Sequence, residues 1–125
     1  MAVYNLSPIF EPQAIATSAA ALIFAPTGAA TVPANYNYLI SVLRVANTTG
    51  SPVGLTVWRV PSGGTPGSTN IVVPGLYVPV CSQAFPDLDI TALWGAMLRA
   101  GDAIWMLAGT GGGLIVHGDG AVIQP

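Results

Sequence analysis

The sequence of 125 residues contains no lysine, three arginines, five acidic residues, one histidine and one cysteine. Charged residues make up 6% of the chain, whereas an average soluble domain contains about 25%. Nucleic-acid binding requires clustered cations that neutralise phosphates, and Arg44, Arg59 and Arg99 are dispersed. We therefore expect no nucleic-acid partner. The single cysteine, Cys81, excludes an internal disulfide.

The uncharged stretch from residue 12 to residue 43 raises the question of a membrane span. A spanning helix needs about 20 predominantly apolar residues, and here Pro26 and Pro33 interrupt the run. A secretory signal is not expected either, because no basic residue precedes Arg44. The sequence therefore predicts no membrane association and synthesis in the cytoplasm.

Residues that could support catalysis or metal binding are few. His117 is the only histidine, and with Cys81 it supplies two of the three or four ligands that zinc requires. Asp87 and Asp89 would share one face of a strand, but no third ligand is near them in the sequence. The glycine-rich segment 109–113 lacks the Lys-Ser/Thr pair of a phosphate-binding loop. We expect no enzyme activity, no cofactor and no metal.

Hydrophobic residues are abundant instead, at 52% of the chain, and the mean hydropathy is +0.64. A chain of this length forms one domain with a sizeable core. Because a free monomer needs surface charge to stay soluble, much of the surface is expected to be covered by copies of the chain or by another protein. The alternative is a monomer that serine, threonine, asparagine and the backbone keep soluble.

The clearest local pattern lies between Tyr38 and Gly64. Two runs of β-branched and aromatic residues, 38–46 and 53–60, flank turn residues at 47–52. This predicts a β-hairpin with a loop of roughly five residues. Polar and apolar residues alternate only weakly in these runs, which is typical of strands covered on both faces. A partner, an arm or a second sheet must then cover the second face.

Short strands separated by glycine and proline turns are expected along the rest of the chain. They fall at 19–25, at 71–80 with a break at Pro74-Gly75, at 103–108, and at 114–117 and 121–123, which are separated by a Gly118–Gly120 turn. Only 91–98 could form a helix. These elements predict an all-β fold, an antiparallel β-sandwich of jelly-roll-like type. Residues 1–18 are interpreted as an extended N-terminal arm and residues 19–125 as the β-sandwich domain.

Three segments resemble small structural proteins of tailed bacteriophages. They are the Arg-x-x-Asn-Thr segment 44–48, the Val-Pro-Ser-Gly-Gly segment 60–64 and the Leu-x-x-Gly-Asp turn 98–102, within a resemblance that covers roughly residues 20 to 123. The resemblance implies a virion protein, most simply a capsid decoration (cement) protein on the capsid exterior. Such a protein would bind and stabilise neighbouring major capsid protein subunits and associate with itself as a dimer or trimer. The expected contact residues are Tyr4, Leu6, Ile9, Phe10, Tyr38, Arg44, Trp58 and Arg59.

Two other functions remain open. The first is a tail, baseplate or fibre component. The second is a carbohydrate-binding β module, in which Trp58, Trp94 and Trp105, with Tyr36 and Tyr38, would form a platform for sugar rings. Complete burial of the three tryptophans would remove the support for sugar binding.

Overall fold

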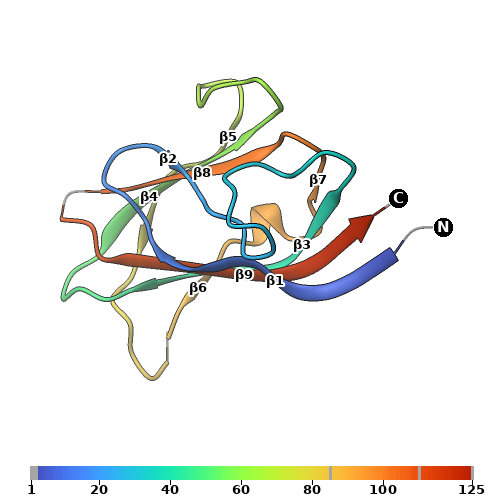
Figure 1. Ribbon diagram of the computed structural model, residues 1–125. Helices are drawn as coiled ribbons and strands as arrows, with labels where there is room; N and C mark the ends of the chain where they lie inside the picture. Colours follow the sequence, from blue (N-terminus) through green and yellow to red (C-terminus); the bar gives the residue numbers. More distant parts are fainter. Residues whose placement is uncertain (1–2, 85, 110, 125) are drawn as a thin grey trace.

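The computed structural model describes residues 3–84, 86–109 and 111–124, with side chains described from residue 7 onward. The fold is all-β and its sheets are antiparallel, as the sequence predicts. No α-helix occurs in these ranges, and the only helical element is a 3-10 turn, η1 (Thr91–Leu93). The strands form two layers, one above the other in Figure 1.

The first layer, sheet A, has five strands in the order β1-β9-β3-β6, with β7 paired to the other end of β3. Their bounds are β1 (Val3–Ala14), β3 (Asn37–Asn47), β6 (Leu88–Asp89), β7 (Met97–Leu98) and β9 (Leu114–Gln124). The second layer, sheet B, has four strands in the order β2-β8-β4-β5. Their bounds are β2 (Ala20–Ala21), β4 (Val53–Val60), β5 (Ile71–Val78) and β8 (Ala103–Ala108).

Strand pairing in both sheets follows a nested pattern. β1 pairs with β9, β2 with β8, β3 with β6 and β4 with β5. Strands of the first half of the chain thus pair with strands of the second half in reverse order. The β4–β5 connection stays within sheet B, whereas the connections at β1–β2, β2–β3, β3–β4, β5–β6, β7–β8 and β8–β9 pass from one sheet to the other.

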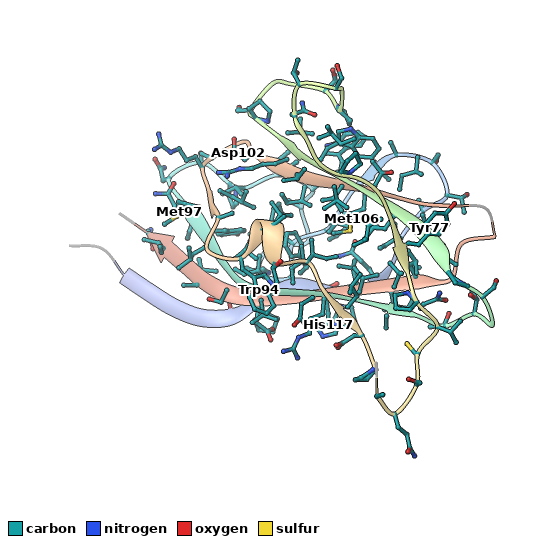
Figure 2. All side chains as sticks on the ribbon, turned by 180° about the vertical axis from the view of Figure 1, so that it is seen from behind. Tyr77, Trp94, Met97, Asp102, Met106 and His117 are labelled. Carbon is teal, nitrogen blue, oxygen red and sulfur yellow. The ribbon has the colours of Figure 1, made fainter. Side chains whose placement is uncertain are left out.

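The hydrophobic core lies between the two sheets. Sheet B contributes Leu55, Val57 and Met106, all fully buried, and Figure 2 shows Met106 between the layers. Three aromatic rings in the core come from β1, from the segment after β2 and from β3. The rings of Phe10 and Phe24 stack with centroids 4.9 Å apart, and Phe24 meets Tyr38 edge to face at 5.1 Å. The other sheet therefore covers one face of β3 and one face of β4, and their other faces are half-buried or exposed, so the expected covering of both faces is not found.

The predicted hairpin between residues 38 and 60 is wrong, although both of its strands are present. β3 lies in sheet A and β4 in sheet B, so the two strands do not pair with each other. The segment between them is a corner held by Asn47, which is buried. Its side-chain amide donates hydrogen bonds to the carbonyl oxygens of Ser51 (2.8 Å) and Val78 (2.9 Å), and its Oδ1 accepts one from the Thr49 N–H (2.8 Å).

A β-bulge explains the weak alternation of β3. The register with β9 shifts between Ile40 and Val42, and the extra residue changes which side chains point inward. Tyr38 and Ile40 are buried before the bulge, and Leu43 and Val45 after it. One alternation of inward and outward side chains therefore does not fit both halves of β3.

Two predicted interruptions are also wrong, because each lies inside one strand. Gly118–Gly120 is the middle of β9, where a Cβ atom at Gly120 would overlap the Leu39 carbonyl oxygen. Glycine is required there for close approach of two backbones and not for a turn. Pro74-Gly75 lies within β5, whose register with β4 shifts between Leu55 and Thr56. The Pro-Gly pair forms an irregularity in an edge strand.

The expected helix and the expected arm also differ from the structure. Of residues 91–98, only Thr91–Leu93 is helical, as one 3-10 turn, because Gly95 follows with φ of 81° and β7 begins at Met97. In the N-terminal segment, residues 3–14 form β1, an edge strand of sheet A, and Ile9 is fully buried. This segment is part of the sheet.

Candidate interaction surface

The outer face of sheet B carries two tryptophans side by side. In β4 and β8, Leu55, Val57, Ile104 and Met106 face the core and are fully buried. Successive side chains on a strand point to opposite faces. The alternate residues, which are half-buried, therefore point outward: Thr56, Trp58, Trp105 and Leu107.

The strand register places these outward residues in rows across the sheet. Trp58 lies directly opposite Trp105 on β8 and Ile71 on β5, and Trp105 lies opposite Ala21 on β2. One row thus crosses all four strands. Directly opposite side chains on antiparallel strands lie within about 4.5–5.5 Å at Cβ. Among the residues that the structure describes, neither indole ring stacks on another aromatic ring.

Tyr77 extends this surface along β5. It lies opposite Gly54, and its ring is 4.0 Å from the position that a Cβ atom of Gly54 would occupy. Tyr77 is 71% exposed and its neighbour Leu76 43% exposed, which are high values for large apolar side chains. We call the surface formed by Ile71, Trp58, Trp105, Leu107 and Tyr77 the tryptophan face.

The tryptophan face carries no charge. The four strands of sheet B contain one ionisable group besides tyrosine, the guanidinium of Arg59. That group donates a hydrogen bond to the backbone carbonyl of Met97 in sheet A, away from the face. Tryptophan and tyrosine without charged neighbours are characteristic of the centres of protein interfaces.

The outer face of sheet A is polar by contrast. Arg44 Nε lies 3.0 Å from Asp89 Oδ1, and both side chains are partly exposed. His117 lies directly opposite Arg44. Asp119 and Ser41 are exposed on the same face, close to His117 and Arg44 along β9 and β3. The molecule therefore presents one outer face without charged groups and one with them.

The residues expected to make contacts are not brought together. Ile9, Phe10 and Tyr38 lie in the core and offer no surface for a contact. Arg44 lies on sheet A and Trp58 on the tryptophan face, on opposite sides of the molecule. Arg59 reaches toward sheet A. The side chains of Tyr4 and Leu6 fall outside the described residues.

Of the aromatic residues expected in a sugar platform, only Trp58 and Trp105 share a surface. Trp94 follows η1 and donates an indole N–H hydrogen bond to the Leu43 carbonyl at 3.3 Å, and Figure 2 shows it away from Tyr77. Tyr36 packs against the core edge to face with Tyr38, with ring centroids 6.5 Å apart.

Leu107 and Tyr77 belong to the tryptophan face but were not among the expected contact residues. Residues Ala103–Ala108 are apolar throughout, so no local pattern in the sequence could have indicated that Leu107 points outward. For Tyr77, the position depends on the register between β4 and β5, which no local sequence pattern reveals.

The candidate chemical groups lie apart. Asp89 is paired with Arg44, and the exposed Cys81 thiol donates a hydrogen bond to the Pro86 carbonyl at 2.9 Å. Among the described residues, no three of His, Cys, Asp and Glu are close enough together to hold a metal ion. In the same ranges, no helix is long and apolar enough to cross a membrane.

The chain matches no protein-family model, and the searches of curated proteins and of solved structures found no match.

Proposed function

We propose that this protein is a structural component of a bacteriophage virion, a capsid decoration protein that binds neighbouring major capsid protein subunits on the capsid exterior. The observation that carries the proposal is the uncharged tryptophan face on a chain with so few charged residues. Exposed apolar patches with aromatic residues mark sites of protein association. The sequence resemblance to small phage virion proteins supports the same assignment.

The strand order supports a jelly-roll sandwich as the finer description of the fold. A jelly roll has two four-stranded antiparallel sheets and two Greek keys, and it recurs in viral capsid and lectin domains. Nested pairing of β1 with β9, β2 with β8, β3 with β6 and β4 with β5 gives two sheets of this kind, with β7 as an addition. A fold does not by itself define a function. The proposal therefore rests on the tryptophan face.

The tryptophan face would provide the apolar centre of the contact. Tyr77 is the most exposed large side chain on it. Tryptophan and tyrosine are enriched among the few interface residues whose truncation costs about 2 kcal/mol or more of binding energy. Repetition of the contact over a symmetric particle would let individually weak contacts add through avidity.

Co-sedimentation with capsid particles tests the proposal. Capsids that lack the protein are mixed with the purified wild type, Tyr77→Ser, Trp58→Ser and the control Trp94→Ser, which removes a tryptophan that lies off the face. Wild type and Trp94→Ser should bind, whereas the two face variants should bind at least about tenfold more weakly. Circular dichroism and thermal unfolding check that each variant is folded.

Two results would contradict the proposal. Wild type that fails to bind capsids but binds isolated tails or baseplates would place the protein in the tail. Equal binding of all variants would show that the tryptophan face is not the contact surface.

Carbohydrate binding is the second candidate, because Trp58 and Trp105 lie side by side, and neither is fully buried. Aromatic rings arranged in this way can stack on sugar rings. Titration with a panel of oligosaccharides, followed by tryptophan fluorescence, tests it. Saturable quenching in wild type and Trp94→Ser that is lost in Trp58→Ser would favour a carbohydrate-binding module over decoration.

A further inference from the structure

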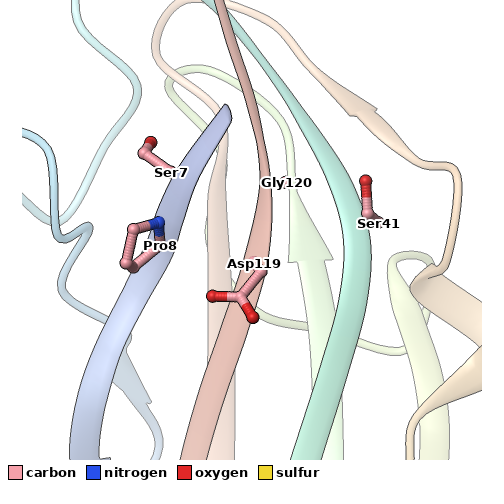
Figure 3. Close-up of a pocket in the computed structure, with 5 residues that line it drawn as sticks. All are labelled: Ser7, Pro8, Ser41, Asp119 and Gly120. Carbon is pink, nitrogen blue, oxygen red and sulfur yellow. The ribbon is translucent and has the colours of Figure 1, made fainter. Parts of the chain in front are cut away.

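The outer face of sheet A contains a hollow of about 380 Å³ where its three longest strands lie side by side. Ser7 and Pro8 of β1, Ser41 of β3, and Asp119 and Gly120 of β9 line it. Figure 3 shows Asp119 between the strand of Pro8 and that of Ser41.

The backbone forms this hollow. β1 has a register shift between Pro8 and Phe10, and β3 has one between Ile40 and Val42. Both shifts lie beside Gly118–Gly120 of β9, so two bulges flank the same point of the central strand. Bulges bend strands, redirect side chains and occur frequently beside functional sites.

The carboxylate of the hollow lacks a partner. Asp119 is exposed, and its carboxylate makes no hydrogen bond or ion pair with the residues that the structure describes. An unpaired carboxylate set in a hollow is suited to a cationic ligand that carries several N–H donors.

One arginine of the chain is also unpaired. Arg44 binds Asp89, and Arg59 binds the Met97 carbonyl. The Arg99 side chain is exposed, and within the described ranges its guanidinium has no partner. Its backbone is fixed in a turn, because the Arg99 N–H donates a 2.9 Å hydrogen bond to Asp102 Oδ2.

We propose that the hollow receives the Arg99 guanidinium of a second copy of this chain, where it contacts Asp119. A guanidinium offers five donors in a plane, and such a flat group fits a hollow with a carboxylate at one side and the Pro8 ring as an apolar wall. The contact is heterologous, since the donor residue and the receiving hollow are different surfaces, and it closes into a ring if the rotation allows. It goes beyond the proposed function by naming the surface of self-association, and it leaves the tryptophan face free for the capsid.

Charge reversal tests the proposal in the absence of capsids. Light scattering measures the mass of the wild type, Asp119→Arg, Arg99→Asp, the double variant, and the control Asp87→Arg, which changes net charge away from the hollow. Wild type and control should be oligomeric. Each single variant should associate about tenfold or more weakly, because like charges then meet. The double variant, and an equimolar mixture of the two single variants, should regain the oligomer.

A monomeric wild type would overturn the proposal, and so would single variants with unchanged mass or a double variant that stays dissociated. Failure here is distinct from failure of capsid binding, since the two experiments use different variants and different faces. The wild-type oligomer should also weaken as sodium chloride is raised, as expected for exposed charges.

Discussion

The side-chain amide of Asn47, at the end of β3, donates a 2.9 Å hydrogen bond to the backbone carbonyl of Val78, at the end of β5. The Asn47 side chain is buried. Because β3 and β5 lie in different sheets, this contact joins the two layers at the corner where the chain crosses between them.

Asn47→Ala should lower the free energy of unfolding by about 2–3 kcal/mol, because it leaves buried carbonyl and N–H groups without partners. The matched control is Asn70→Ala. Asn70 also makes two side-chain hydrogen bonds, to Thr65 and Gly67, but in a surface loop, so its loss should cost about 1 kcal/mol or less. Urea denaturation measures both, and equal losses would contradict the role given to Asn47.

Gly120→Ala should destabilise the fold by about 3 kcal/mol or more, because the added Cβ would overlap the Leu39 carbonyl oxygen in the paired strand. Gly50→Ala is the control, since a Cβ atom there meets nothing within 4 Å. It should change stability by less than about 0.5 kcal/mol. A stable Gly120→Ala protein would mean that β3 and β9 can separate locally without cost.

Phe10→Ala should cost about 3–5 kcal/mol, as expected for a buried aromatic residue, because the Phe10 ring stacks on Phe24 in the core. Glu11→Ala, an exposed neighbour on the same strand, should have almost no effect. Deletion of residues 2–12 removes most of β1 and should abolish cooperative thermal unfolding. A truncated protein that still melts cooperatively would show that this segment is a separable arm.

Tyr38→Phe should reduce the dependence of the protein's stability on alkaline pH. Burial raises the pKa of the Tyr38 phenol above 10.0; nearby Thr27 lowers it and Tyr36 adds to the rise. The folded state then holds the proton more tightly than the unfolded state, so the associated stability is complete below pH 10.0 and is lost as the pH rises through the folded pKa.

Unfolding titrations between pH 8 and 11 measure this effect. Wild type should lose stability above pH 10.0 more steeply than Tyr38→Phe. Tyr77→Phe, which alters an exposed phenol, should follow the wild type. Parallel curves for wild type and Tyr38→Phe would contradict the assigned burial effect.

Local composition predicted the strands of this fold better than their partners. The runs 38–46 and 53–60 correspond closely to β3 (Asn37–Asn47) and β4 (Val53–Val60), because β-branched and aromatic residues favour a pleated surface wherever it lies. Their assignment to different sheets depends on contacts distant in sequence, such as that between Asn47 and Val78. A short polar break is compatible with both a hairpin and a corner.

Glycines were the least predictable residues. Gly118 and Gly120 have the composition of a turn, but they lie within β9, where the neighbouring strands leave no space for a Cβ atom. The positions of residues on the candidate surface were also not predictable from local sequence. Trp58 was expected to make contacts as part of the predicted hairpin, whereas its position beside Trp105 follows from the register of β4 and β8.

The pairing of β1 with β9 joins residues such as Tyr4 and Ile123, so sheet A cannot close until almost the whole described chain has been brought together. The chain loses conformational entropy in that closure before the contacts between the strands can lower its free energy. We therefore expect folding in milliseconds to seconds, as in other β proteins dominated by distant contacts. During that interval the apolar strands are exposed. At a high concentration of newly made chains, we expect aggregation to compete with folding.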